Sequence, residues 1–238
     1  MNRILSRLLL TAIVGASIGV VAGGQAAQAA SVNCPPDIIN TTVQTDVNVP
    51  SGTCTIKNST VNGKVTVQPG ASLNIFGSTI QGSVTANHPG LIQIDALAPC
   101  TTPDPSSCVR LTRIVGSVTI NGAIAGGNYI CNGTKIGGDL TITNSASGAT
   151  WEIGSPRCTA LSPNSSGNRI IGSVLISDNA GNVKFDNNIV GGSGQFLNNS
   201  GGGEVVKNKF GGSLTVNNQT PCWTVIANTA PGGFTIIC

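Results

Sequence analysis

A short phrase recurs nine times along this chain, at a spacing close to twenty residues. Each copy has a turn residue, an outward position and then an apolar, a polar and an apolar residue, as in Gly63-Lys64-Val65-Thr66-Val67. The copies begin at Thr45, Gly63, Gly82, Gly116, Gly138, Gly172, Gly192, Gly212 and Gly232. Successive starts differ by 18, 19, 34, 22, 34, 20, 20 and 20 residues, so two of the steps carry an insertion. A fixed period of this size predicts a solenoid in which each repeat forms one rung.

Two short strands are expected in each rung. The phrase itself alternates apolar and polar residues, which is the pattern of a half-buried strand. A turn rich in Gly, Asn or Pro follows, and then a second strand, as at residues 73–76 and 183–185. Corner residues such as Asn58 and Asn208 tolerate a positive φ, and their amides can bond to the rung above or below. The sequence therefore predicts an all-β protein, a parallel β-helix of about nine rungs on the order of 40 Å long.

The first 29 residues have the layout of a secretory signal peptide. Arg3 and Arg7 precede an apolar run, and small residues end at Ala29. An uncleaved anchor helix is the alternative, but the run is short for a membrane span and contains Gly15 and Gly19. We therefore expect a secreted or cell-surface protein with a lead-in at residues 30–38 and one elongated β-helix domain at 39–238. No later apolar stretch is long enough to span a bilayer, so no membrane span is expected after signal cleavage.

The charge balance argues against polyanionic and membrane partners at the level of the whole chain. The sequence has 12 basic and 9 acidic side chains, a formal net charge of +3. Removing Arg3 and Arg7 with the signal leaves 10 basic and 9 acidic groups, a net charge of +1. Neither nucleic acid nor an anionic membrane is therefore an expected partner.

All eight cysteines lie beyond the signal peptide, and an even number in an exported chain predicts disulfides. Eight cysteines allow 105 connectivities, so the sequence does not settle the pairing. Pairing between neighbours in the sequence is our expectation: Cys34 with Cys54, Cys100 with Cys108, Cys131 with Cys158, and Cys222 with Cys238. A zinc site is the alternative, but no Cys-x-x-Cys pair occurs and His88 is the single histidine. We expect no metal and no cofactor.

The Gly-Ser-Val-Thr type phrases and the turn Pro69-Gly70-Ala71-Ser72-Leu73 resemble those of right-handed parallel β-helix proteins. The resemblance covers residues 39–238 and is greatest to small exported bacterial β-solenoids, with bactofilin-like scaffolds and pectate-lyase-like enzymes more distant. It implies a right-handed coil. Bactofilins are cytosolic, whereas this chain has a signal peptide and cysteines.

A polysaccharide-active enzyme on this fold is the main functional alternative. Such lyases and hydrolases need carboxylates gathered on neighbouring rungs with an acid or base beside them. Asp186 and Glu204 come closest to a shared register, but they occupy opposite ends of their strands, and no Asp-x-Asp occurs. We therefore predict no catalytic residues and a protein that is not an enzyme.

Ice binding is a minor alternative, suggested by Thr at the outward position of the first strand. This position reads Thr66, Thr85, Thr119, Thr141, Leu175, Gln195, Thr215 and Thr235. A second matching rank would be required, and the neighbouring rank is interrupted by Lys64, Asp139 and Gly233. High strand propensity explains exposed threonines more simply.

The two insertions, near residues 96–110 and 154–167, are the expected place for recognition because loops on a rigid scaffold commonly bind ligands. Arg110, Arg113, Trp151 and Arg157 are predicted to line a shared edge that contacts a glycan or a surface protein of the cell envelope. The alternative is that the loops carry disulfides and Trp151 fills the core. The sequence thus favours a non-catalytic structural or adhesive module, with end-to-end self-association open because terminal rungs offer unpaired strand edges.

Overall fold

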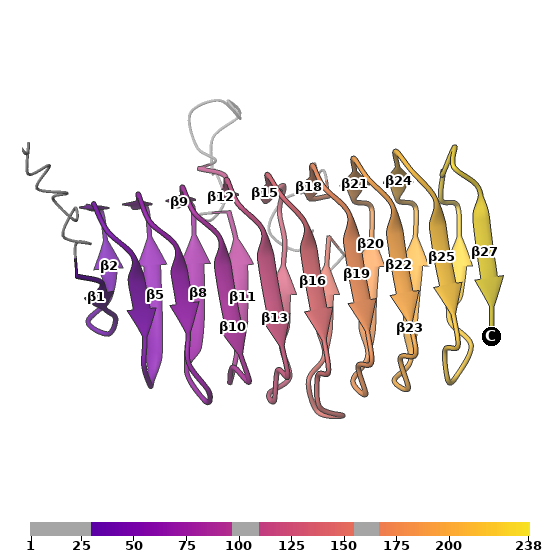
Figure 1. Cartoon of the computed structure of the whole chain (residues 1–238), viewed down its shortest axis with the longest axis horizontal. Helices are drawn as coiled ribbons and strands as arrows, with labels where there is room; N and C mark the ends of the chain where they lie inside the picture. The colour runs from indigo at the N-terminus through magenta and orange to yellow at the C-terminus, as the bar shows by residue number, and fades with distance from the viewer. Residues whose placement is uncertain (1–29, 97–109, 155–166) are drawn as a thin grey trace, which may run out of the picture.

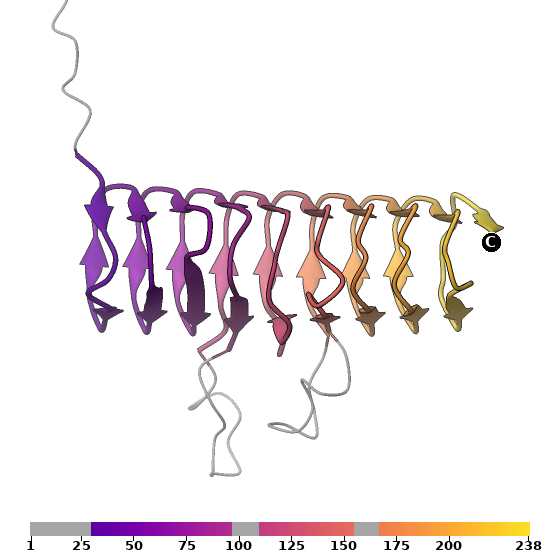
Figure 2. The same cartoon turned by 90° about the horizontal axis from the view of Figure 1, so that it is seen from below.

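The chain coils into a right-handed parallel β-helix of about nine turns, shown from two directions in Figures 1 and 2. This computed structural model describes residues 30–96, 110–154 and 167–238. Three parallel sheets, here called A, B and C, run the length of the coil, and each complete turn contributes one strand to every sheet. The predicted all-β, parallel β-helix fold is confirmed.

The three sheets differ mainly in strand length. Sheet A consists of β1 (Val32–Asn33), β4 (Val47–Val49), β7 (Val65–Val67), β10 (Val84–Asn87), β13 (Val118–Asn121), β16 (Leu140–Thr143), β19 (Val174–Ser177), β22 (Gly194–Leu197), β25 (Leu214–Asn217) and β27 (Phe234–Ile237). Sheet B consists of β2 (Ile38–Ile39), β5 (Thr53–Lys57), β8 (Ser72–Phe76), β11 (Ile92–Asp95), β14 (Asn128–Ile130), β17 (Trp151–Ile153), β20 (Val183–Asp186), β23 (Gly203–Val206) and β26 (Thr224–Ile226). Sheet C consists of β3 (Thr42–Val43), β6 (Thr60–Val61), β9 (Thr79–Ile80), β12 (Arg113–Ile114), β15 (Lys135–Ile136), β18 (Arg169–Ile170), β21 (Ile189–Val190) and β24 (Lys209–Phe210).

The strands of sheets A and B are the two strands that the sequence pattern predicts for each rung. The strand of sheet C is a third one that was not predicted. Strands of this sheet have only two residues, too few to display an alternating pattern. The second residue of each strand is apolar and, from β6 to β24, is buried against the other two sheets. What looked like a plain corner between units is therefore the third wall of the core.

Each inward position stacks on its equivalent in the next rung, so the core is a set of apolar columns. Val65, Val84 and Val118 are in register on β7, β10 and β13, and all three are fully buried. Burial of this kind is the main stabilising force of a solenoid, and each rung depends on its neighbours for it. At the last strand the same columns end in Phe234 and Ile236, which are 50% and 48% exposed.

Polar side chains link the rungs at the corners. In the corner between sheets B and C, the Asn188 amide donates to Asn208 Oδ1 at 3.1 Å, and the Asn208 amide donates to Asn228 Oδ1 at 3.0 Å. Asn188 and Asn208 are completely buried. The predicted asparagine ladder is confirmed here. Asn58 also has the predicted positive φ and its amide donates to Asn40 Oδ1 of the neighbouring rung at 2.6 Å, although Ser59 takes the buried position in that rung.

Two of the predicted disulfides are confirmed, Cys34–Cys54 and Cys222–Cys238. Cys131 is also in a disulfide, whose other half lies outside the described residues. Cys100, Cys108 and Cys158 are outside them as well, so the two remaining pairings stay predictions. The disulfides are consistent with an oxidising, extracellular type of environment.

The part of the chain that the structure describes contains no helix long and apolar enough to cross a membrane. The predicted signal peptide, residues 1–29, lies outside this part.

Candidate functional site

The four residues predicted to share a ligand-binding edge do not all lie together in the structure. Arg113 is the first residue of β12 and is exposed on sheet C. Arg110 is exposed near the same corner, and its guanidinium donates to the backbone oxygen of Asn58 at 3.3 Å and to the Asn58 side chain. Arg157 lies outside the described residues. Trp151 does not belong to any exposed edge.

Trp151 is a core residue, and its assignment to a ligand-binding edge is wrong. It is 1% exposed and occupies the inward column of sheet B, in register with Asn128 and Val183. Its indole N–H donates to Ser145 Oγ at 3.1 Å, which satisfies the one polar group of the ring. The alternative, that Trp151 fills the core, is therefore correct.

A row of basic side chains follows the outward position of sheet C. Arg113 is directly opposite Lys135, and Lys135 is directly opposite Arg169. The row continues through Ile189 to Lys209. We call Arg113, Lys135, Arg169 and Lys209 the basic row. Adjacent members are about 4.8 Å apart in the hydrogen-bonding direction, so the row runs parallel to the solenoid axis.

No member of the basic row has an ion pair or a side-chain hydrogen bond with any residue that the structure describes. Like charges placed directly opposite each other destabilise a sheet, so the arrangement is not explained by fold stability. Asp139, an acid at the next corner, accepts the backbone N–H of Ser173 at 2.7 Å instead.

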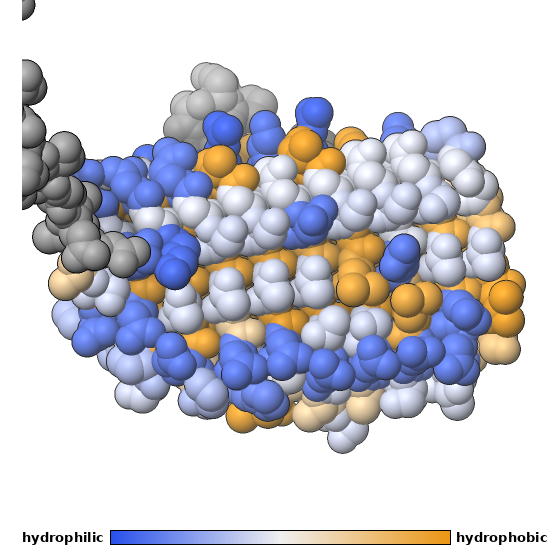
Figure 3. Space-filling model, viewed as in Figure 1, coloured by the Kyte–Doolittle hydropathy of each residue, from blue (hydrophilic) through white to orange (hydrophobic). Residues whose placement is uncertain are grey.

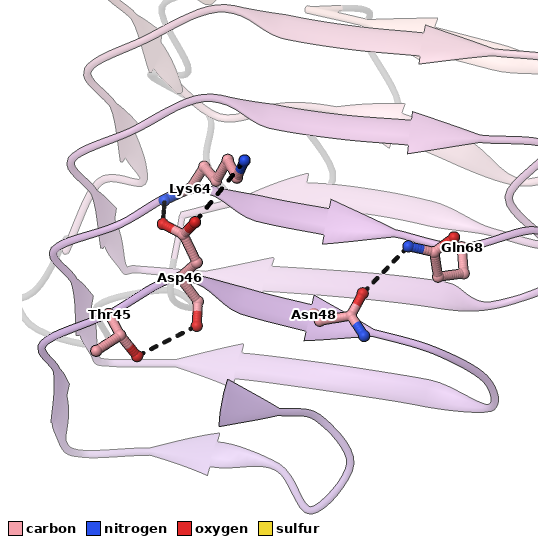
Figure 4. Close-up of polar contacts among 5 residues, drawn as sticks. All are labelled: Thr45, Asp46, Asn48, Lys64 and Gln68. Carbon is pink, nitrogen blue, oxygen red and sulfur yellow. Dashed lines mark hydrogen bonds and ion pairs between the residues drawn. The ribbon is translucent and has the colours of Figure 1, made fainter. Parts of the chain in front are cut away.

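Two lysines on the other two sheets have counter-ions. Lys64 Nζ is 3.8 Å from the carboxylate of Asp46, which also accepts the Lys64 backbone N–H at 3.0 Å (Figure 4). Lys184 Nζ is 3.5 Å from Glu204 on the neighbouring strand of sheet B. Lys57 and Lys207 are also exposed without an ion pair among the described residues, but only on sheet C do such cations occupy one register position over several rungs.

Exposed apolar side chains accompany the basic row. Ile189 is within the row itself and is 48% exposed. Val115 and Ile171 each follow a basic residue by two positions, at the corner toward sheet A, and are 37% and 42% exposed. The face of sheet C therefore combines cations with small apolar surfaces over several consecutive rungs.

Sheet A presents a different face. Figure 3 shows pale rows of residues of intermediate hydropathy that run along the axis over this sheet. The threonine rank is in register from Thr66 through Thr85 to Thr119. The serine rank beside it is used internally, because Ser83 Oγ accepts the backbone N–H of Ser117 at 3.1 Å and Ser173 Oγ that of Ser193 at 3.2 Å. These bonds give the second rank a structural role, which weakens the argument for ice binding.

Two buried carboxyl groups lie near the corner between sheets B and C. Asp95 is 6% exposed and accepts the Asn132 amide at 2.7 Å, and burial raises its pKa. Asp186 is 3% exposed and its Oδ1 has no hydrogen-bond partner. Burial raises the pKa of Asp186 to about 7, and the nearby charge of Glu204 adds to the rise. As the sequence predicts, the two acids do not share a register, because Asp186 is opposite Val206 and Glu204 is opposite Lys184. They are diagonal neighbours close enough for their charges to interact.

A carboxyl with a raised pKa near a second carboxyl resembles an acid–base pair. Asp186 is nevertheless almost completely buried, so a substrate has no direct access to it. Within residues 30–96, 110–154 and 167–238, no three His, Cys, Asp or Glu side chains are grouped to hold a metal ion.

Comparison with family models, curated proteins and solved structures finds no match for this chain. The resemblance to exported bacterial β-solenoids and the functions considered from it therefore stay predictions. The basic row is brought together by the fold and was not predicted from the sequence. Its signal is simple: Arg113, Lys135, Arg169 and Lys209 each precede the first glycine of a phrase by three residues.

Proposed function

We propose that this chain is an exported, non-catalytic β-solenoid that acts as an adhesive or structural module at the cell surface or outside the cell. The observation that carries the proposal is the basic row, a line of cations in register on sheet C without a counter-ion among the described residues, whereas Lys64 and Lys184 pair with acids. Anionic components of the cell envelope are the partners that such a face attracts.

Rigidity supports the same conclusion. Buried side-chain amides bond rung to rung, as Asn188 does with Asn208, and core columns stack in register along the coil. Ordered ladders of this kind hold the exposed rows of each sheet in fixed positions. A binding face on a stiff rod can engage an extended partner without having to order itself first.

The proposal is tested by sedimentation of the purified, oxidised protein with isolated cell-envelope material. We expect the protein to cosediment at low ionic strength and to be released as salt screens the charges. Protein that stays in the supernatant with every envelope fraction would contradict an adhesive role.

A polysaccharide-active enzyme is the second candidate, and the observation in its favour is the interaction of Asp186 with Glu204. Release of reducing or unsaturated sugars from envelope polysaccharides, abolished by Asp186→Asn, would establish it. We expect no release, because Asp186 is 3% exposed and cannot contact a polymer on the surface.

A further inference from the structure

The geometry points to an extended carboxylated polysaccharide as the ligand of sheet C, lying along the solenoid axis with its carboxylates on Arg113, Lys135, Arg169 and Lys209. This inference rests on the proposed function and specifies its site and ligand class. The four cations occupy one outward position in five consecutive strands, β12, β15, β18, β21 and β24, with Ile189 at the fourth.

The spacing of the row favours a linear polymer over a compact anion. Positions repeat every ~4.8 Å along a parallel sheet, a distance similar to the advance of one sugar in an extended pyranose chain. In an extended two-fold chain, the carboxylates that face one side recur on every second sugar, so they meet every second rung, at Arg113, Arg169 and Lys209. The flexible Lys135 side chain, between the first two, can reach either neighbouring carboxylate. A single small anion could contact only two adjacent members.

The side-chain chemistry favours carboxylates on a sugar backbone. Arg113 and Arg169 carry guanidinium groups, whose planar fork matches a carboxylate, while Lys135 between them supplies a compact charge. Val115, Ile171 and Ile189 offer exposed apolar surface beside the cations, where the C–H faces of sugar rings can pack. A polyanion would also relieve the repulsion between Arg113, Lys135 and Arg169.

The other faces lack this combination. Sheet A presents threonine and asparagine at the corresponding outward positions, from Asn48 to Thr141, without charge. Sheet B alternates Glu152, Lys184 and Glu204, so that the lysine lies between two acids. An anionic chain on sheet B would meet repulsion at two of these three positions.

The test is calorimetric titration of the full oxidised protein with mannuronate oligosaccharides of two to eight sugars. We expect affinity to rise with length and to level off near five sugars, the number of rungs from Arg113 to Lys209. The triple variant Arg113→Gln, Lys135→Gln, Arg169→Gln should bind about tenfold or more weakly, because three exposed charge contacts are lost. Neutral mannose oligosaccharides of the same linkage should not bind.

Two controls separate this inference from a general charge effect. A variant with Lys57→Gln, Lys64→Gln and Lys184→Gln loses the same three charges from sheets A and B and should bind like the wild type. Arg113→Lys with Arg169→Lys keeps the charge but loses the planar forks, so it should weaken binding less than the triple variant does. Residual binding by this variant also shows that the row tolerates substitution without unfolding.

Equal weakening by the two triple variants, or equally tight binding of a polyphosphate with the same number of charges, would overturn the inference. Envelope binding that survives substitution of the row would also overturn it while leaving the proposed function intact. Failure of the wild-type protein to bind any envelope fraction would instead contradict the proposed function.

Discussion

Lys135 and Arg169 lie directly opposite each other on β15 and β18, two cations on neighbouring strands without a counter-ion among the described residues. Lys184, by contrast, is opposite Glu204 and pairs with it at 3.5 Å. The same sequence thus contains a compensated and an uncompensated arrangement of the same residue type. The difference between them can be measured without knowledge of any ligand.

Removing one charge from the basic row should stabilise the protein. We expect Lys135→Gln to raise the free energy of unfolding by about 0.2–1 kcal/mol at low salt, because repulsion from Arg113 and Arg169 is relieved. The gain should shrink in high salt, where exposed charges are screened. Denaturant titrations at two ionic strengths measure both effects.

Lys184→Gln is the matched control for that substitution. Its loss removes an attraction to Glu204 and should leave stability unchanged or lower it by up to about 1 kcal/mol. A loss of stability of equal size in both variants would mean that the basic row carries no repulsive energy.

The buried asparagine ladder should be important for stability. The Asn188 amide donates to Ile153 O at 2.9 Å and to Asn208 Oδ1 at 3.1 Å, and its own Oδ1 accepts the Asn168 N–H. Asn188→Ala leaves these buried groups unsatisfied and should cost about 2–4 kcal/mol by denaturant unfolding.

Asn48 provides the comparison for the ladder. It also bonds between rungs, to Asn33 and to Gln68, but on the half-exposed outer face of sheet A, as Figure 4 shows for Gln68. Water can replace those bonds, so Asn48→Ala should change stability by only about 0.5 kcal/mol. Similar losses from both substitutions would contradict the importance of burial.

Gly194 and Phe210 should be energetically coupled. Gly194 occupies a core column of sheet A that holds Val174 and Leu214 in the neighbouring rungs, and a Cβ there would lie 2.4 Å from the Phe210 ring. Gly194→Val alone should therefore overpack the core and destabilise by about 1–3 kcal/mol. Phe210→Val alone should leave a cavity.

The double variant Gly194→Val, Phe210→Val tests that coupling. The added valine fills space that the smaller residue 210 vacates, so the double variant should be more stable than the sum of the single effects predicts, by at least about 1 kcal/mol. Additive effects in the thermodynamic cycle would show that the two positions do not share the same space.

Asp186 should make stability depend on pH. Burial and Glu204 raise its pKa to about 7, whereas an unfolded Asp titrates near about 3.9. The folded state therefore binds this proton more tightly than the unfolded state does. The resulting contribution to the free energy of unfolding is complete below about pH 4 and is lost as the pH rises to about 7.

Asp186→Asn removes this titration. Relative to the wild type, the variant should gain stability between pH 4 and pH 7 and keep that gain at higher pH. Asp178→Asn is the control, since Asp178 is exposed and its backbone φ of 58° is one that Asn adopts readily. Melting curves of the three proteins across this range decide the matter, and parallel pH profiles for wild type and Asp186→Asn would contradict the assignment.

The repeat predicted most of the fold because the phrase and the second strand each display their own alternation. Sheet C was not predicted because a strand such as Lys135–Ile136 is too short to show an alternating pattern. Its only signal in the sequence is an apolar residue two places before a glycine. Trp151 was misplaced because it stands next to an insertion in the sequence, while the register puts it beneath Val183 in the core.

The basic row was not predicted from the sequence for a different reason. Net charge averages over all faces and gave +1, but the fold separates paired from unpaired cations. Aligning the repeats on their first glycine would have collected Arg113, Lys135 and Arg169 in one column from the sequence alone. That none of them has a counter-ion depends on where the acids point, which requires the structure.

The most direct test of the central claim is lysine footprinting with and without a mannuronate oligosaccharide of six sugars. The protein is acetylated briefly, and mass spectrometry reports the modification of each lysine. We predict protection of Lys135 and Lys209 on sheet C, with Lys64 and Lys184 reacting as they do in the free protein. Protection of Lys184 or Lys64, or equal protection of all lysines, would contradict a binding face on sheet C.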